Sequence, residues 1–290
     1  MSKKISDCDI FILGSTGMLG NTLLRYFKFA NKYNILGSFR GSRPPKKLNS
    51  FDELLLGNVD VDDKNLLIKT LKKYNPKVVI NCVGLVKQLD ESTDPIKAIE
   101  INSLLPHKLF NICESINAKL IHISTDCVFN GKKGSYKESD NPNATDIYGR
   151  AKLLGEVINS KSITLRTSII GHEISTSHSL LEWFLSQKDE IDGYGKAVFS
   201  GLTTVELARV IHDFVIPNLN LSGLYNISSE PINKFDLLSL IAEQYRKDIK
   251  INKNTELVID RSLNSDKFRS ETGFKSLSWK DMIYEMYKFG

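Results

Sequence analysis

The sequence is poor in the features that mark secreted, metal-binding and membrane proteins. Its four cysteines fit neither a disulfide framework nor a cysteine metal site, and its five histidines form no HExxH-type cluster, so no metal is expected. No apolar run approaches the length needed to cross a bilayer. No basic run is interleaved with aromatic residues, so neither a membrane nor a nucleic acid is predicted as a partner.

The N-terminal residues also lack a secretory signal. Lys3 and Lys4 are followed within a few residues by Asp7 and Asp9, which leaves no room for an apolar h-region. Together with the scattered cysteines, this predicts a cytoplasmic protein in a reducing compartment. The net charge of +5 is mild and is expected of an ordinary basic surface, and 290 residues can bury a large core.

Apolar strands and helices alternate along the first 170 residues, which predicts a parallel sheet covered by helices on both faces. The predicted strands are 10–13, 33–39, one within 54–61, 78–83, 120–124 and 163–170. The predicted helices are 19–29, 65–74, 96–116 with a bend near Pro106, and 148–159. The predicted fold is therefore α/β, with a Rossmann-type doubly wound parallel sheet.

The second half of the chain is less regular. Helices are predicted at 180–185, 205–216 and 234–246, with a strand at 224–227. We expect residues 1–170 to form the nucleotide-binding Rossmann domain and residues 171–290 to form mainly a smaller C-terminal substrate-binding lobe. This boundary is approximate, because in such folds the chain often crosses between the lobes more than once.

A glycine-rich turn follows the first predicted strand. Gly14, Gly17 and Gly20 are spaced three apart between that strand and the next helix. Glycine permits a sharp turn and the close approach of a pyrophosphate, which the helix N-terminus then binds. The pattern predicts a dinucleotide site with these contact residues: Gly14, Thr16, Gly17, Met18, Leu19 and Gly20.

The end of the second strand indicates which dinucleotide binds. NAD sites usually carry an acidic residue there, whereas a 2′-phosphate favours arginine. Arg40 and Arg43 follow this strand without an acidic residue, so NADPH is predicted and NADH is the less favoured alternative. The remaining predicted cofactor contacts follow the third and fourth strands: Asp60, Val61, Cys82, Val83 and Gly84.

Three further residues predict the chemistry. Tyr148 and Lys152 are four apart in a predicted helix and so share one face. The ammonium is expected to lower the pKa of the phenol toward the working pH, and also to hold the nicotinamide ribose. Thr125 follows the fifth strand at the carboxyl edge of the sheet, where its hydroxyl can hydrogen-bond a substrate carbonyl. The combination predicts an oxidoreductase.

Three segments resemble the extended short-chain dehydrogenase/reductase superfamily, and within it the dTDP-4-dehydrorhamnose reductase family. They are ISTDCVFNG at 123–131, YKESD at 136–140 and YGRAKLLGE at 148–156. The resemblance implies reduction of the C4 ketone of a nucleotide-linked 4-keto-6-deoxyhexose, with hydride from NADPH and a proton from Tyr148. It further implies a set of substrate contacts, namely Lys87, Thr125, Asp126 and Tyr148. Homodimers are common in this family, which makes a homodimer an expectation.

Two departures from the family pattern leave the sugar and the reaction open. Cys127 stands where the family usually has tyrosine, and Ile169 stands where it has a tryptophan on the sugar side of the pocket. A 4,6-dehydratase uses Asp-Glu after the threonine, and Cys127 after Asp126 argues against that activity. A nucleotide-sugar epimerase on the same scaffold remains an alternative. So does a non-catalytic NADP-binding subunit resembling the regulatory β-subunit of methionine adenosyltransferase.

Overall fold

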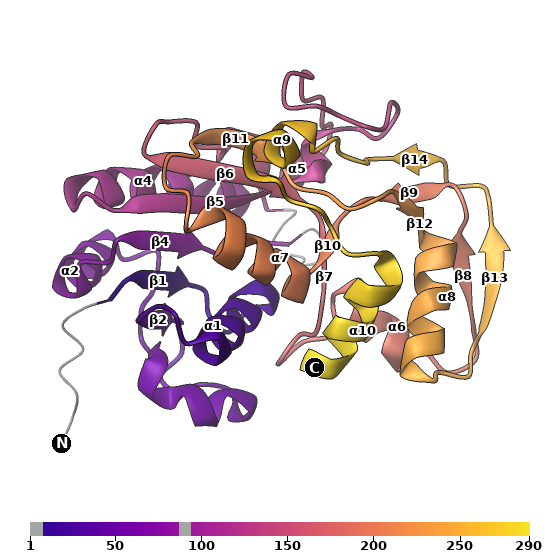
Figure 1. The fold of residues 1–290 in the computed structure, drawn as a ribbon, viewed down its shortest axis with the longest axis horizontal. Coiled ribbons are helices and arrows are strands. Elements are labelled where there is room, and N and C mark those ends of the chain that lie inside the picture. The colour runs from indigo at the N-terminus through magenta and orange to yellow at the C-terminus, as the bar shows by residue number, and fades with distance from the viewer. Residues whose placement is uncertain (1–7, 87–93) are drawn as a thin grey trace.

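The computed structural model describes residues 8–86 and 94–290, and within them the chain forms a seven-stranded parallel sheet of order β11-β6-β5-β4-β1-β2-β3 (Figure 1). Its strands are β1 (Ile10–Leu13), β2 (Ile35–Ser38), β3 (Leu55–Leu56), β4 (Val78–Asn81), β5 (Lys119–Thr125), β6 (Ser162–Thr167) and β11 (Gly223–Asn226). Strand β1 lies between β2 and β4, so β2 and β3 extend the sheet toward one edge and β4, β5, β6 and β11 extend it toward the other. This reversal of strand order makes the position between β1 and β4 the topological switch point, where open α/β sheets bind their ligands. The predicted doubly wound fold is confirmed.

Helices cover both faces of this sheet. They are α1 (Met18–Ala30), α2 (Lys64–Tyr74), α3 (Pro95–Ala98), α4 (Leu105–Ser115), α5 (Ile147–Leu154) and α7 (Thr204–Val210). Shorter turns of helix are η1 (Lys46–Leu54), η3 (Ile99–Leu104), η4 (Asp126–Val128) and η5 (Ile211–Val215). None of the helices in the described part of the chain is long and apolar enough to cross a membrane.

The strand β1 shows why the sheet is buried on both sides. Successive side chains of a strand point to opposite faces. Ile10 and Ile12 pack in the core cluster that contains the apolar residues of α1, whereas Phe11 and Leu13 pack in the cluster that contains those of α2 and α4. All four side chains are buried, as expected of a parallel strand with a helix layer on each face.

The C-terminal region adds smaller sheets and helices, most of which Figure 1 shows to the right of the central sheet, whereas α9 lies beside β11. The strand groups are β10 (Leu202–Thr203) with β7 (Ile169–Ile170), β12 (Ile232–Asn233) with β9 (Ala197–Phe199) and β14 (Ile259–Asp260), and β13 (Lys250–Asn254) with β8 (Glu190–Tyr194). The remaining helices are α6 (Leu180–Ser186), α8 (Lys234–Tyr245), α9 (Asp266–Thr272) and α10 (Trp279–Phe289). In the middle of this region the chain returns to the central sheet as β11.

The helix predicted at 96–116 is divided into α3, the π-helix η3 and α4. Pro106, near the start of α4, has no N–H to donate to the carbonyl of Asn102, four residues earlier, so the regular ladder is interrupted there. Gly155 approaches this same carbonyl so closely that a Cβ at Gly155 would lie 1.9 Å from the oxygen of Asn102.

Several other predicted elements end earlier than expected. The helix predicted to reach residue 159 ends at Leu154, because the following residues turn inward and Glu156 pairs with Arg166 of β6. The strand predicted at 163–170 divides into β6 and β7, which belong to different sheets. The third and fourth strands end at Leu56 and Asn81, so the predicted cofactor contacts beyond them lie in loops.

Candidate active site

The glycine turn between β1 and α1 has the geometry of a phosphate-binding loop. Gly14 has a φ of +80°, a conformation that L side chains rarely adopt, and the N–H of Gly17 donates to its carbonyl at 3.1 Å. A Cβ at Gly20 would lie 2.1 Å from the Gly14 oxygen, so this position requires glycine. The first amides of α1, from Met18 on, have no acceptor within the helix and are available to an anion.

A buried serine fixes this turn against the neighbouring strand. The hydroxyl oxygen of Ser15 lies 3.1 Å from the carbonyl oxygen of Ile12 and 2.9 Å from that of Ser38, at the end of β2. Gly37 leaves room for it, because a Cβ there would lie 2.3 Å from the Ser15 oxygen. The sequence analysis did not assign Ser15 a role, although its place inside the glycine pattern was a signal.

The predicted cofactor residues of the other strand ends surround this turn. A Cβ at Gly14 would lie 3.0 Å from a methyl carbon of Val83, so the loops after β1 and β4 are in contact, and the neighbouring Gly84 is exposed. Arg40 and Arg43 are exposed in the loop after β2. The other residues predicted to contact the cofactor are Thr16, Leu19, Asp60, Val61 and Cys82, and all are partly or fully buried.

Asp60 and Val61 lie in a different kind of element than predicted, and Lys87 is not among the residues that the structure describes. Asp60 and Val61 lie in a loop rather than at the end of a strand, and a carboxylate oxygen of Asp60 accepts a hydrogen bond from the N–H of Asp62 at 3.0 Å. The N–H of Val59 donates to the carbonyl of Phe39, which holds this loop beside the end of β2. Lys87 lies outside the described residues.

Thr125 and Tyr148 meet at the carboxyl edge of the sheet. Thr125 is the last residue of β5, and its side-chain oxygen accepts a hydrogen bond from the N–H of Cys127 at 3.1 Å. Tyr148 lies in the first turn of α5, with its phenol close enough to the Thr125 side chain for that side chain to lower the phenol pKa. Gly149 permits this approach, because a Cβ there would lie 2.3 Å from the carbonyl oxygen of Cys127.

Lys152 lies one turn further along α5 and is buried. Its ammonium donates a hydrogen bond to the carbonyl of Ile123 at 2.7 Å, and a Cβ at Gly84 would lie 3.9 Å from the nitrogen. Burial lowers the pKa of Lys152 to about 8, although Glu156 and Cys82 raise it. The fold therefore brings Lys152 to the end of β4, where the predicted cofactor contacts lie.

The expected lowering of the tyrosine pKa is wrong. Burial raises the pKa of the Tyr148 phenol, and Cys127 and Asp126 raise it further, while the Thr125 side chain partly opposes the change. The phenol is therefore protonated at neutral pH. That is the state required of a group that donates a proton.

The thiol of Cys127 is unsuited to nucleophilic chemistry. Burial raises its pKa to about 12, and Asp126 also raises it, so the thiolate is scarce at neutral pH. Asp126 is itself buried, and the Thr125 hydroxyl donates to it at 3.3 Å. Cys127 and Asp126 are thus wall residues beside Thr125.

A buried ion pair lies next in sequence to the residues predicted to be catalytic. Arg166 donates to both carboxylate oxygens of Glu156 at 2.7 Å, and each side chain is only 3% exposed. The hydroxyl of Ser124 donates to the same carboxylate at 2.7 Å. Because Ser124 precedes Thr125 and Glu156 follows Lys152 by four residues, this network ties β5, β6 and the end of α5 together. This network was not predicted from the sequence, although Glu156 lies in the segment YGRAKLLGE at 148–156 that carries the resemblance.

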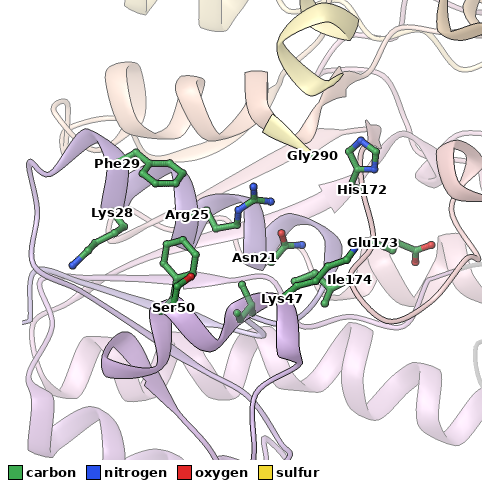
Figure 2. Close-up of a pocket in the computed structure, with 12 residues that line it drawn as sticks. Asn21, Arg25, Lys28, Phe29, Lys47, Ser50, His172, Glu173, Ile174 and Gly290 are labelled. Carbon is green, nitrogen blue, oxygen red and sulfur yellow. The ribbon is translucent and has the colours of Figure 1, made fainter. Parts of the chain in front are cut away.

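A separate cavity lies beside α1, and Figure 2 shows its lining. It has a volume of about 830 Å³ and is bounded by α1, η1, the residues after β7 and the C-terminal residue, so its lining includes none of the predicted site residues. Two of its cations already have partners, since Lys28 pairs with Glu53 at 2.9 Å and Arg25 donates to the carbonyl of Phe289. Within the described ranges, no three His, Cys, Asp or Glu side chains gather to hold a metal ion.

Comparison with known proteins assigns the chain to a family. The family model described as "RmlD substrate binding domain" matches residues 8–288. The chain belongs to this family. That result confirms the resemblance on which the sequence analysis relied, and it extends over nearly the whole chain.

Three relatives cover different shares of the chain. The probable low-salt glycan biosynthesis reductase Agl14 of Haloferax volcanii is 31% identical over 55% of this chain and 53% of its own length. The dTDP-4-dehydrorhamnose reductase of Aggregatibacter actinomycetemcomitans is 25% identical over 77% of this chain and 74% of its own length. Methionine adenosyltransferase 2 subunit beta of Bos taurus is 30% identical over 51% of this chain and 41% of its own length. The alignments with the first and third thus span about half or less of those proteins.

A solved structure shows the same fold over nearly the whole chain. The dTDP-4-dehydrorhamnose reductase of Bacillus anthracis, in complex with NADP, superimposes with a TM-score of 0.80 at 20% identity and covers 98% of this chain and 100% of its own.

Proposed function

We propose that the protein is an NADPH-dependent reductase of the C4 ketone of a nucleotide-linked 4-keto-6-deoxyhexose. The observation that carries the proposal is the convergence of Thr125, Tyr148 and Lys152 at the carboxyl edge of the sheet, next to the glycine turn. The relatives support it, because two are named as reductases, one of them a dTDP-4-dehydrorhamnose reductase. In this proposal residues 1–170 bind the cofactor, and residues 171–290 mainly bind the sugar nucleotide.

The residues around the glycine turn fit a dinucleotide. The open amides at the start of α1 suit its pyrophosphate, and Gly14 and Gly20 leave no side chain in the way. Gly84, exposed beside the Lys152 ammonium, leaves room for the nicotinamide half. NADPH, when bound, supplies the hydride. The solved relative in complex with NADP supports this choice of cofactor.

Side chains of this protein would donate the proton to the substrate carbonyl oxygen and stabilise the negative charge that develops on it. Tyr148 holds a proton on its phenol oxygen and donates it to the carbonyl oxygen of the substrate. The Thr125 hydroxyl hydrogen-bonds the same oxygen and stabilises it as it becomes an alkoxide. Lys152, oriented by the Ile123 carbonyl, would hold the nicotinamide ribose and place positive charge near the phenol.

The direct test measures NADPH oxidation with a panel of dTDP- and UDP-linked 4-keto-6-deoxyhexoses. We expect one NADPH to be consumed for each ketone reduced, with product formation confirmed by mass spectrometry. Turnover without net NADPH consumption would instead identify an epimerase, which recycles its hydride. If no ketone in the panel is reduced, the proposed reaction is wrong.

A second candidate function is a non-catalytic NADP-binding subunit, favoured by the match to methionine adenosyltransferase 2 subunit beta. An intact Thr125, Tyr148 and Lys152 set argues for catalysis, since a purely binding role does not require it. Isolation of a stoichiometric synthetase partner, combined with no reductase activity of the purified protein, would favour the second candidate.

The exposed arginines after β2 give a prediction on cofactor choice. We expect NADPH to be preferred over NADH by roughly tenfold or more, about 1.4 kcal/mol, because a charge-assisted contact with the 2′-phosphate is worth that much. Arg40→Ala should remove most of this preference, whereas Lys72→Ala, an exposed cation on α2, should leave it intact. The measurement is kcat/KM with each cofactor. Equal efficiency of the wild type with both cofactors would contradict the assignment.

The buried lysine gives a prediction on pH. Lys152 has a pKa lowered to about 8, so its ammonium is present below that pH and is lost as the pH rises through it. We therefore expect kcat/KM for reduction to fall above about pH 8, while Tyr148 stays protonated. Lys152→Arg should abolish this alkaline limb even if its overall rate is lower, because arginine keeps its charge. A wild-type profile that stays flat to about pH 10 would show that Lys152 does not control the rate.

A further inference from the structure

An ammonium group from the C-terminal region lies beside the candidate active site. Lys234 begins α8 directly after β12, and the pairing of β12 with β9 places Ile232 opposite Phe199. The Lys234 nitrogen lies 3.9 Å from the centroid of the Phe199 ring. Within residues 8–86 and 94–290, its ammonium forms neither a hydrogen bond nor an ion pair.

The surroundings of Lys234 connect it to the segment that follows Thr125. Burial lowers the pKa of Lys234 to about 8, and the charges of Asp126 and Cys127 oppose this lowering. Asp126 is buried and accepts a hydrogen bond from Thr125. Lys234 therefore reaches the wall of the site on the side formed by the C-terminal region.

The ammonium of Lys234 is open to a ligand. The side chain is half-buried, and the aromatic ring that it faces accepts no conventional hydrogen bond from it. Lysine donates three hydrogen bonds and acts as a point charge toward phosphate and carboxylate oxygens. An anionic oxygen placed between Lys234 and the Thr125 end of β5 would satisfy it.

We propose that Lys234 binds an anionic oxygen of the sugar-nucleotide substrate. This rests on the proposed function, which supplies the substrate class. The diphosphate is an anionic group that every sugar nucleotide carries, and a carboxylate on the sugar is a second source of the same chemistry. The cofactor phosphates are assigned elsewhere, to the turn before α1, so Lys234 acts on the substrate alone.

The test measures probe binding to the protein loaded with NADP⁺. The probes are dTDP, UDP, UDP-glucose and UDP-glucuronate, titrated by calorimetry into the wild type, Lys234→Met, Lys234→Arg and a control. The control is Lys253→Met, since Lys253 also lies over a ring, 5.1 Å from the centroid of Phe235, but is exposed on β13. NADP⁺ affinity and thermal unfolding are measured for every variant, to separate a binding defect from a folding defect.

We expect Lys234→Met to weaken binding of the nucleoside diphosphates by ~10-fold or more, as for a lost charge-assisted hydrogen bond, with NADP⁺ affinity unchanged. Lys234→Arg should retain most of the affinity, and Lys253→Met should match the wild type. Weakening confined to UDP-glucuronate would identify a sugar carboxylate as the anion. Equal probe affinities in the wild type and Lys234→Met would overturn the proposal, and so would a wild type that binds none of the probes.

The same measurements separate this inference from the proposed function. Lys234-dependent probe binding by a protein that reduces no 4-keto sugar would leave the inference standing and remove the proposed reaction. Ketone reduction by a protein whose probe binding does not depend on Lys234 would support the proposed reaction and overturn the inference. A role in folding alone would lower the unfolding temperature of Lys234→Met without changing its probe affinity, which also overturns the inference.

Discussion

Replacing Tyr148 by phenylalanine is expected to lower kcat by ~10²–10⁴-fold while NADPH affinity changes little. The substitution removes only the hydroxyl beside Thr125, and the ring still fills the same half-buried space. The reaction then lacks its positioned proton donor. Single-turnover NADPH oxidation reports the chemical step, and equilibrium binding reports cofactor affinity.

A matched control for this experiment is Tyr136→Phe. Tyr136 is buried, its ring stacks on Phe129 with the centroids 4.0 Å apart, and its hydroxyl forms hydrogen bonds with Lys133 and Asn130 of the neighbouring loop. It should lose some stability and keep most of the turnover. A Tyr148→Phe protein that reduces a 4-keto sugar nucleotide at the wild-type rate would show that the proton comes from another group.

Replacing Glu156 by glutamine is expected to destabilise the protein by about 3–5 kcal/mol. The substitution leaves the Arg166 guanidinium buried beside a neutral amide, and each side chain of the native pair is only 3% exposed. Urea unfolding should show the loss as a lower midpoint. Since Glu156 also raises the pKa of Lys152, the alkaline limb of the rate profile should move to lower pH in any variant that remains folded.

A surface ion pair provides the control for the buried ion pair. Lys250 and Glu190 pair at 2.8 Å with side chains 71% and 57% exposed, and Glu190→Gln should leave the unfolding midpoint almost unchanged. Glu156→Asp, which keeps the charge, provides a milder variant if the glutamine form does not fold. Equal stability of Glu156→Gln and Glu190→Gln would mean that the buried pair contributes nothing.

The features that could be predicted are those encoded locally. The glycine turn was predicted because Gly14, Gly17 and Gly20 stand at fixed offsets between a strand and a helix, and each local requirement can be stated without the rest of the fold. Tyr148 and Lys152 were predicted to share a face from helix geometry alone. The central sheet followed in the same way, from short apolar runs separated by helical segments.

What could not be predicted depends on contacts between distant segments. The pKa of Tyr148 rises mainly because of burial, and Cys127 and Asp126 raise it further, but the spacing of Tyr148 and Lys152 contains no information on that burial. Likewise, Lys234 reaches Phe199 only because β12 pairs with β9. The early end of α5 follows from the pairing of Glu156 with Arg166, on a strand that comes later in the chain. Helix propensities describe local preferences only and cannot predict this long-range contact.

The place of β11 in the central sheet has a consequence for synthesis of the chain. The ribosome releases β6 long before β11, which forms the outer edge of the sheet from residues Gly223–Asn226. Until those residues emerge, β6 presents an unpaired row of backbone N–H and carbonyl groups to the solvent. A chain stopped shortly before residue 223 would therefore contain every proposed catalytic residue and still be prone to associate through that open edge.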